Sequence, residues 1–184
     1  MSTRRRSLPI RPSGPQRSVV WFPRFPDSAA IDGYRRRHDP RWSSVAPHLT
    51  LVFPFHTALS ALQVQTHVKR IVRIWPQLPV TFQGVEPYLD EFLFLRVRQG
   101  APALMELHRQ LYRGILAPFL RSDIAYIPHV MVGRVSGRDE LRAALADGWM
   151  LDAALSDAVR ELTVLHVAND GTMSPEATIA LDQP

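Results

Sequence analysis

The sequence contains no cysteine among its 184 residues. It therefore has no disulfide, no thiolate metal site and no cysteine nucleophile. No apolar run is long enough to cross a membrane. The sequence also lacks a glycine-rich phosphate loop, a dinucleotide-binding fingerprint and a serine nucleophile elbow. Its histidines show no metal-ligand pattern with carboxylates. These absences exclude several common enzyme classes, and we expect neither a metal nor a cofactor.

Acidic residues are missing from the first 17 positions, which hold five arginines. With those five subtracted from the 22 basic residues, 17 remain against 17 acidic ones, so the formal charge of +5 belongs to this segment. The segment lacks the apolar core of a secretion signal, and its prolines interrupt a transit helix. We predict a disordered basic tail over 1–17, a single domain over 18–184 and a cytoplasmic location. The tail either contacts RNA phosphates or serves only solubility.

Two apolar segments, 46–53 and 127–134, each contain a proline followed at once by a histidine. Both are rich in β-branched or aromatic residues, which predicts strands. Because residues i and i+2 of a strand share a face, His48 lies on the same face as Thr50, and His129 repeats this geometry. Two such strands side by side would bring both imidazoles to one cleft. That arrangement suits acid–base chemistry on a phosphate.

Helical and extended periodicities alternate along the rest of the chain. The predicted helices occupy 28–37, 60–75, 102–117 and 136–148, and the predicted strands occupy 19–22, 46–53, 80–82, 91–98, 127–134, 159–168 and 177–181. Asp27 and Ser60 are the expected caps of the first two helices. Each half of this order contains one Pro-His strand, helices on either side of it and a following pair of strands. The order therefore predicts a duplicated α+β unit.

The sequence HLTLVF at 48–53 resembles the H-x-T-L-x-F element of the two-histidine phosphoesterase superfamily, in its 2′-5′ RNA ligase-like branch. The sequence HVMVGR at 129–134 resembles the second element of that family, H-x-T-L-x-R. The resemblance implies an α+β fold with two lobes, in which two antiparallel sheets flank a central cleft and helices lie outside. It also implies a monomer that acts, without metal or ATP, on RNA ends or nucleotides with a 2′,3′-cyclic phosphate or on 2′-5′ linkages.

The resemblance assigns roles to four residues. His48 and His129 become the general acid and base, in an order that the sequence leaves open. Thr50 and Arg134 become phosphate-binding residues. Arg134 follows His129 by five positions, an odd step that turns it away from the cleft in a regular strand. A bulge at Gly133 would re-aim it, so we predict an irregularity at or near Gly133.

Met131 departs from the family pattern, because it stands where the second element has threonine. A thioether cannot donate a hydrogen bond, and the loss of one preorganised donor costs roughly 10²–10³ in rate. Ser136 and Tyr126 are candidate replacement donors. The leading hypothesis is a metal-independent RNA 2′,3′-cyclic phosphodiesterase or 2′-5′ RNA ligase. The alternative is a weakly active or non-catalytic module that binds an RNA end or a phosphorylated nucleotide.

Two further features carry alternative interpretations. The arginines at 35–37 either offset the dipole at a helix end or face a phosphate. Trp42 and Tyr88 lie in predicted loops and are candidates for stacking on a nucleobase. Phe53 is assigned to the core rather than to a stacking surface.

Overall fold

The computed structural model describes residues 14–25 and 28–182. The predicted tail lies largely outside these residues, but its end does not. Strand β1 (Gln16–Trp21) begins before the predicted domain boundary. Arg17 is buried within β1, and its Nε lies 2.5 Å from a carboxylate oxygen of Glu176. The folded domain therefore starts earlier than position 18.

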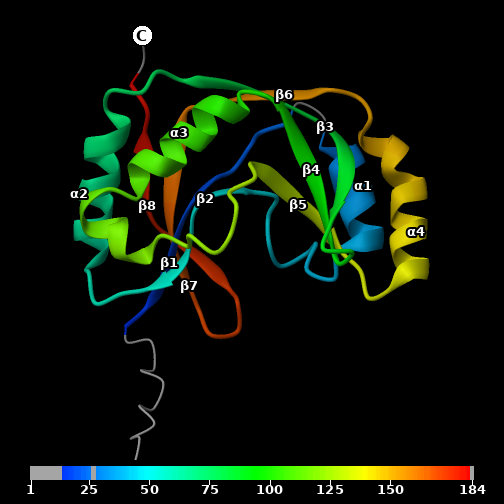
Figure 1. Ribbon diagram of the computed structural model, residues 1–184, viewed down its shortest axis with the longest axis horizontal. Helices are drawn as coiled ribbons and strands as arrows, with labels where there is room; N and C mark the ends of the chain where they lie inside the picture. Colours follow the sequence, from blue (N-terminus) through cyan, green and yellow to red (C-terminus); the bar gives the residue numbers. More distant parts are fainter. Residues whose placement is uncertain (1–13, 26–27, 183–184) are drawn as a thin grey trace, which may run out of the picture.

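Eight antiparallel strands form one sheet in the order β6-β3-β4-β5-β2-β1-β7-β8. The strands after β1 are β2 (Leu49–His56), β3 (Leu78–Tyr88), β4 (Phe92–Gln99), β5 (His129–Arg134), β6 (Leu155–Val159), β7 (Glu161–Val167) and β8 (Met173–Ala180). Within the described residues, β2 and β5 are paired only at Leu49 and Val130. The sheet divides there into the β2 lobe (β2-β1-β7-β8) and the β5 lobe (β6-β3-β4-β5), which flank the centre of Figure 1. The predicted two sheets are thus two parts of one, because this pair joins them.

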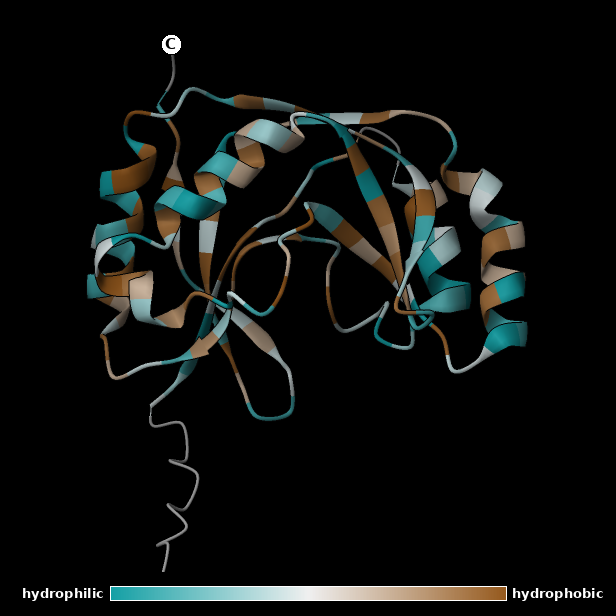
Figure 2. Ribbon diagram, in the orientation of Figure 1, coloured by the Kyte–Doolittle hydropathy of each residue, from teal (hydrophilic) through white to brown (hydrophobic). Residues whose placement is uncertain are grey.

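The four α-helices of the described residues cover the two lobes (Figure 1). Helices α1 (Ala29–His38) and α4 (Arg138–Ala146) pack on the β5 lobe, whereas α2 (Ala61–Val72) and α3 (Ala101–Leu111) pack on the β2 lobe. Figure 2 shows hydrophobic and hydrophilic residues alternating along each helix, as expected of helices that bury one face against a sheet. The predicted helices are confirmed in number and order.

The ends of the helices show which of the predicted caps and boundaries the structure has. Asp27 lies outside the described residues, and Ser28 occupies the cap position of α1 without a side-chain cap hydrogen bond. Ser60 caps α2 as predicted, in a reciprocal pair of hydrogen bonds with Gln63. The third predicted helix ends at Leu111, and a 3₁₀ helix follows at Gly114–Phe119. A second 3₁₀ helix, at 147–151, follows α4.

Each lobe draws on both halves of the sequence. Helix α1 joins two strands of the β2 lobe but packs on β5, and α3 joins two strands of the β5 lobe but packs on β2. The predicted strand at 159–168 is in fact two strands, with Arg160 between them. Strand β6 pairs with β3 and β7 pairs with β1, so the chain crosses from one lobe to the other at this residue. The prediction joined Val159 to the strand that follows and did not include β6 as a separate strand, although two charged residues, Arg160 and Glu161, stand at the crossing.

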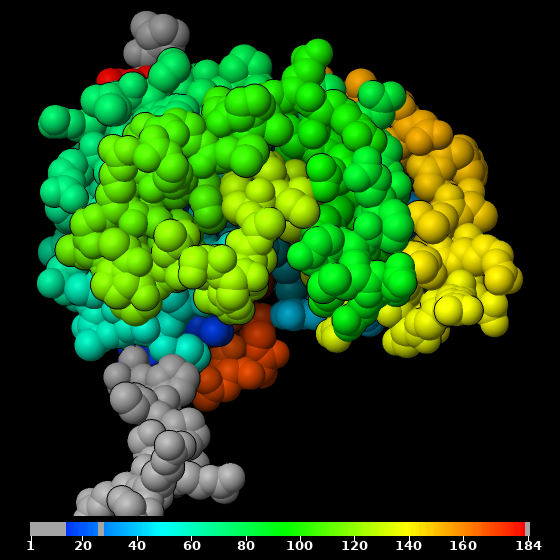
Figure 3. Space-filling model, in the orientation of Figure 1, coloured from blue at the N-terminus to red at the C-terminus, as the bar shows by residue number. Residues whose placement is uncertain are grey.

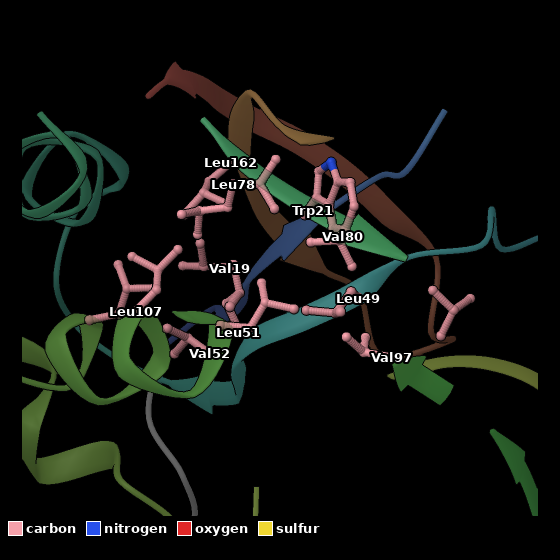
Figure 4. Packing of buried hydrophobic residues seen from close by; sticks show 14 of the residues in the cluster. Val19, Trp21, Leu49, Leu51, Val52, Leu78, Val80, Val97, Leu107 and Leu162 are labelled. Atoms are coloured by element: carbon pink, nitrogen blue, oxygen red, sulfur yellow. The ribbon is translucent and has the colours of Figure 1, made fainter. Parts of the chain in front are cut away.

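A continuous hydrophobic core lies against the covered face of the sheet (Figure 4). Leu49 and Leu51 of β2 and Val130 of β5 have no exposed surface. The alternation of faces in a strand then places His48 and Thr50 on the opposite, uncovered face. The predicted assignment of the leucines to the core is confirmed.

Candidate active site

The two histidine strands line one pocket at the junction of the lobes. His48, Thr50, His129 and Met131 all border this cavity of about 170 Å³, which we call the histidine pocket. The backbone pair that joins the lobes directly follows both histidines. Residues 81 positions apart in the sequence thus meet because their strands touch at this point.

The same hydrogen bond orients both imidazoles. His48 Nδ1 lies 2.8 Å from the carbonyl oxygen of Ala46, and His129 Nδ1 lies 2.6 Å from that of Ile127. A carbonyl oxygen only accepts, so each Nδ1 carries the hydrogen. The other nitrogen, Nε2, is then an acceptor in the neutral ring. Among the described residues, neither Nε2 has a hydrogen-bond partner, which leaves both available to a ligand.

Partial burial lowers the pKa of both imidazoles. It lowers the pKa of His129 to about 4, with a smaller lowering by the nearby Arg96 and His48. Burial also lowers the pKa of His48, against the hydrogen bond to its backbone acceptor, which raises it. The His129 ring is stacked on Phe94, with ring centroids 3.5 Å apart and an interplanar angle of 15°. Both shifts favour the neutral form of the ring, in which Nε2 accepts a hydrogen bond.

Side chains replace a strand along the free edge of β2. After the single pair with β5, the backbone of β2 is hydrogen-bonded on this side by residues of α3 and the segments that follow it. These bonds are His108 Nδ1 to Leu51 O (2.7 Å), Phe53 N to Tyr112 Oη (2.9 Å) and Tyr126 Oη to Thr50 O (3.0 Å). Burial raises the pKa of Tyr126 well above its usual range, so the hydroxyl remains a donor. The strands can diverge into a cleft while the backbone of Thr50 stays fixed.

A cationic wall closes one side of the histidine pocket. Arg35, Asp39 and Arg41 line it. Arg35 is buried, and its Nη2 lies 2.7 Å from Asp39 Oδ2 and 2.6 Å from the carbonyl oxygen of Val45. The backbone amide of Arg41 donates to Asp39 Oδ1 at 2.9 Å. Two arginines against one carboxylate leave a net positive wall, as an anionic ligand requires.

The sequence only partly predicted this wall. Of the arginines at 35–37, Arg35 faces the pocket, whereas Arg37 pairs with Asp147 on the outside. Asp39 and Arg41 were missed, because they lie in a loop whose polar composition is typical of solvent-exposed segments. The feature of the sequence that could have indicated their place in the site was their closeness to the first Pro-His strand.

The predicted irregularity at Gly133 is confirmed. Met131 and Gly133 face consecutive residues of β4, so Val132 is an extra residue in β5. A Cβ atom on Gly133 would lie 2.7 Å from Leu93 Cδ1 and 2.8 Å from the carbonyl oxygen of His38. The bulge therefore needs glycine, because α1 and β4 approach this backbone too closely for a side chain.

The bulge turns Arg134 to the face of the sheet that carries Met131, since its cross-strand neighbour is Phe92. Arg134 nevertheless does not line the histidine pocket. Its Nε lies 2.6 Å from a carboxylate oxygen of Glu91, and its guanidinium carbon lies 5.5 Å from the centre of the Phe92 ring. Its phosphate-binding role stays a prediction, and the structure gives the side chain two other partners.

Neither candidate replacement for the missing threonine borders the histidine pocket. Tyr126 directs its hydroxyl to the backbone of Thr50. Ser136 lines a different cavity, together with Arg134 and Trp42, and its backbone amide donates to Glu140. The side of the histidine pocket next to Met131 therefore lacks the hydroxyl donor that the family pattern supplies.

Within the described residues, no group of three or more histidine, aspartate or glutamate side chains could hold a metal ion. No helix in that part of the chain is long and apolar enough to cross a membrane.

Comparison with known proteins identifies the family. The model of the 2′-5′ RNA ligase superfamily matches residues 23–171. The chain belongs to this superfamily. A Bacillus licheniformis relative, named "Putative phosphoesterase", is 27% identical over 169 residues, which cover 89% of this chain and 96% of the relative. A Halalkalibacterium halodurans relative of the same description is 28% identical over 176 residues, covering 89% and 95%.

Solved structures show the same fold. A protein of Thermus thermophilus superposes with a TM-score of 0.65 at 14% identity, over 90% of this chain and 97% of that one. Escherichia coli LigT complexed with 3′-AMP superposes with a TM-score of 0.62 at 21% identity, over 93% and 100%. Membership of the superfamily and the LigT-like fold together indicate a phosphoesterase.

Proposed function

We propose that the protein hydrolyses 2′,3′-cyclic phosphates at RNA ends or on nucleotides, with His48 and His129 as general acid and base. The observation that carries the proposal is the pair of imidazoles in one pocket, each with Nδ1 held by a carbonyl and Nε2 free. With a phosphate between them, one imidazole can take a proton from the attacking water while the other gives a proton to the leaving oxygen, without a metal. The reverse reaction would join a cyclic phosphate end to a 5′-hydroxyl end.

The proposed reaction needs one neutral and one protonated imidazole. A bound phosphate diester carries negative charge, which raises the pKa of any imidazole beside it. One ring can then be protonated, although burial alone disfavours its protonated form. The neutral ring removes a proton from water as the water oxygen attacks phosphorus. The protonated ring delivers its proton to the leaving ribose oxygen as the P–O bond breaks. For a 2′-phosphate product, the acid must lie beside the 3′ oxygen.

The remaining groups of the histidine pocket stabilise the negative charge that develops on the phosphate oxygens during the reaction. The Thr50 hydroxyl can donate to a non-bridging phosphate oxygen. Arg35 and Arg41 hold positive charge in the wall, and the buried pair with Asp39 keeps Arg35 in place. These groups act without the second hydroxyl that Met131 replaces.

The test is turnover of adenosine 2′,3′-cyclic phosphate in the presence of EDTA. Wild type should release the 2′-phosphate, and His48→Ala and His129→Ala should each lower turnover by about 10³–10⁴. His56→Ala is the matched control, because His56 lies at the end of the same strand as Thr50 and outside the histidine pocket. Absence of turnover by wild type on any cyclic phosphate or 2′-5′ linked substrate would refute the proposal.

A second candidate function rests on Met131. A protein that has this fold but only binds an RNA end, without catalysing a reaction, would not need the hydroxyl donor that Met131 replaces. Equilibrium binding of adenosine 2′-phosphate, unaccompanied by any product from the cyclic substrate, would favour this module. A large rise in turnover in Met131→Thr would instead show that the methionine limits an existing catalyst.

A further inference from the structure

The histidine pocket lacks a hydrogen-bond donor on the side of Met131, and the wall next to it contains another source of donors. The pocket is small, at about 170 Å³, so an anion within it lies close to more than one wall. Among the described residues that line it, Arg35 and Arg41 carry the only permanent positive charges. The two guanidinium groups differ in how far the protein itself already engages them.

Arg35 is committed to the protein. Its side chain is buried, its Nε and Nη2 both donate to Asp39 Oδ2, and Nη2 also donates to the carbonyl oxygen of Val45. A buried ion pair of this kind is costly to break, because either partner would be left as an uncompensated charge. Arg35 therefore holds the wall together and adds positive potential, but a ligand would have to displace Asp39 to take over its donors.

The guanidinium of Arg41 is largely available. The side chain is exposed and makes no ion pair with any residue that the structure describes. The backbone amide is fixed on Asp39 Oδ1, and Nη2 donates to the carbonyl oxygen of Gly171 at 2.7 Å. A guanidinium has five N–H donors, so most of them remain for a ligand. Burial is the largest cause of the lowered pKa of His48, and the charges of Arg35 and Arg41 lower it further, so Arg41 lies within electrostatic reach of that imidazole.

The acceptor of Arg41 belongs to the turn between β7 and β8, residues 168–172, which we call the β7–β8 turn. The turn is braced internally, because the amide of Thr172 donates to Asp170 Oδ1 at 2.8 Å. Gly171 has a φ of +81°, and a Cβ atom on it would lie only 2.8 Å from Arg41 Nη2. The guanidinium thus lies directly against this glycine, which supplies both the left-handed conformation and the space.

The β7–β8 turn also borders the site. Met173, the first residue of β8, lines the histidine pocket two positions after Gly171. Figure 3 shows the surface hollowed between the yellow-green segment before β5 and the green β3–β4 hairpin, and the orange-red β7–β8 segment lies below this hollow. A guanidinium held by the turn is therefore held beside the pocket.

We infer that Arg41 makes the phosphate contact that Met131 cannot make, with its guanidinium held in place by the β7–β8 turn. The inference rests on the proposed function, because the contact is to the phosphate between the two histidines. A charged N–H donor binds a phosphate oxygen more strongly than a neutral hydroxyl does, so one guanidinium can replace the absent threonine. Arg41 is then a catalytic residue that comes from outside both histidine strands, and Gly171 is a positioning residue.

A double-mutant cycle between positions 41 and 131 tests the exchange. The measured quantity is kcat/KM for adenosine 2′,3′-cyclic phosphate in the presence of EDTA. Arg41→Met should lower it about 10²-fold, as expected for the loss of one preorganised donor. Met131→Thr should change the wild-type value by less than about threefold but should restore about tenfold in the Arg41→Met background, since only there is the donor missing. Arg36→Met is the matched control and should leave kcat/KM unchanged, because Arg36 is exposed at the end of α1 and lines a different cavity.

The β7–β8 turn has a test of its own. Gly171→Ala places a methyl group against the Arg41 guanidinium, so kcat/KM should fall about tenfold. A purely structural role of the turn would give the same loss whichever residue stands at position 41. A positioning role predicts instead that Gly171→Ala causes no further loss in the Arg41→Met background. Gly137→Ala is the matched control, since Gly137 also has a positive φ, +124°, but nothing lies within 4 Å of a Cβ atom there.

Two results would overturn the inference while the proposed function stands: unchanged turnover in Arg41→Met, or a loss in that variant that Met131→Thr does not restore. If wild type turns over no cyclic phosphate, the proposed function fails, and affinity for inorganic phosphate decides the inference. Calorimetric titration should then show that wild type binds phosphate about tenfold more tightly than Arg41→Met does. Equal affinities, or no binding by wild type, would overturn the inference.

Discussion

The histidines that precede β2 and begin β5 are held by the same kind of backbone hydrogen bond, but the residues around them differ. Each holds the Nδ1 of its histidine on the carbonyl oxygen two residues earlier. Two residues after the histidine, β2 carries the hydroxyl of Thr50, whereas β5 carries the thioether of Met131. The contrast shows that the orientation of the imidazoles is common to both strands, while the side chain two residues further on is not.

The surroundings diverge further along each strand. The free edge of β2 is hydrogen-bonded by histidine and tyrosine side chains, and the other edge of β5 pairs with β4 through a bulge. The β2 side of the site is therefore polar and anchored, and the β5 side is aromatic and apolar. The predictions below test this asymmetry, from the largest effect to the smallest.

Removing either imidazole should have the largest effect, because both are required for one proton exchange. We expect His48→Ala and His129→Ala each to lower kcat by about 10³–10⁴. The double variant should be no slower than the slower single variant, since residues that act as a unit are not additive. Single-turnover kinetics with a cyclic nucleotide measures this. Independent, multiplicative losses would mean that the two strands do not serve one reaction.

The hydroxyl of Thr50 should matter more than the thioether of Met131. Thr50→Val keeps the shape of the side chain and removes the donor, so kcat should fall about 10²-fold. Thr50→Ser should recover most of that loss. Met131→Leu should change kcat less than threefold, because neither side chain donates. Comparable losses at the two positions would contradict the asymmetry.

Acid should destabilise the protein through the partly buried imidazole of His129. The folded-state pKa of His129, about 4, lies below the unfolded value of 6.5, so the folded state binds fewer protons between those values. Its stabilising contribution is complete above pH 6.5 and is lost as the pH falls towards 4. His129→Gln should remove up to about 3 kcal/mol of this loss. Urea unfolding at pH steps from 7 to 4 measures it, and identical pH slopes for variant and wild type would contradict the burial.

The smallest effect should come from the edge of β2. Tyr126→Phe leaves the carbonyl oxygen of Thr50 without its donor, at a cost of about 1 kcal/mol in unfolding free energy. It should also raise KM, because the strand that carries Thr50 is less firmly held. Tyr112→Phe is the companion variant, since it affects Phe53 rather than Thr50. An unchanged KM in Tyr126→Phe would show that this bond serves stability alone.

Much of the fold was predictable because its signals are local. Leu49 and Leu51 alternate with His48 and Thr50, and that pattern alone fixes which face of β2 is buried. The odd step to Arg134, together with Gly133, indicated the bulge. These features depend on neighbours within a few residues, which the sequence displays directly.

The features that were missed depend on long-range packing. The crossing at Arg160 falls inside one predicted strand, and the pairing of β6 with β3 and of β7 with β1 distinguishes its two parts. The union of the sheets rests on a single backbone pair. Arg35, Asp39 and Arg41 reach the histidine pocket because α1 packs across onto the β5 lobe, which no local pattern in that loop reveals.

The pair formed by Leu49 and Val130 is the joint between the two lobes. Each of the two pocket histidines is the residue immediately before this joint. If the lobes opened about it, the cleft would widen at its far ends while the spacing of the two imidazoles stayed nearly constant. Under the proposed function, substrates of different bulk would then meet an unaltered pair of imidazoles.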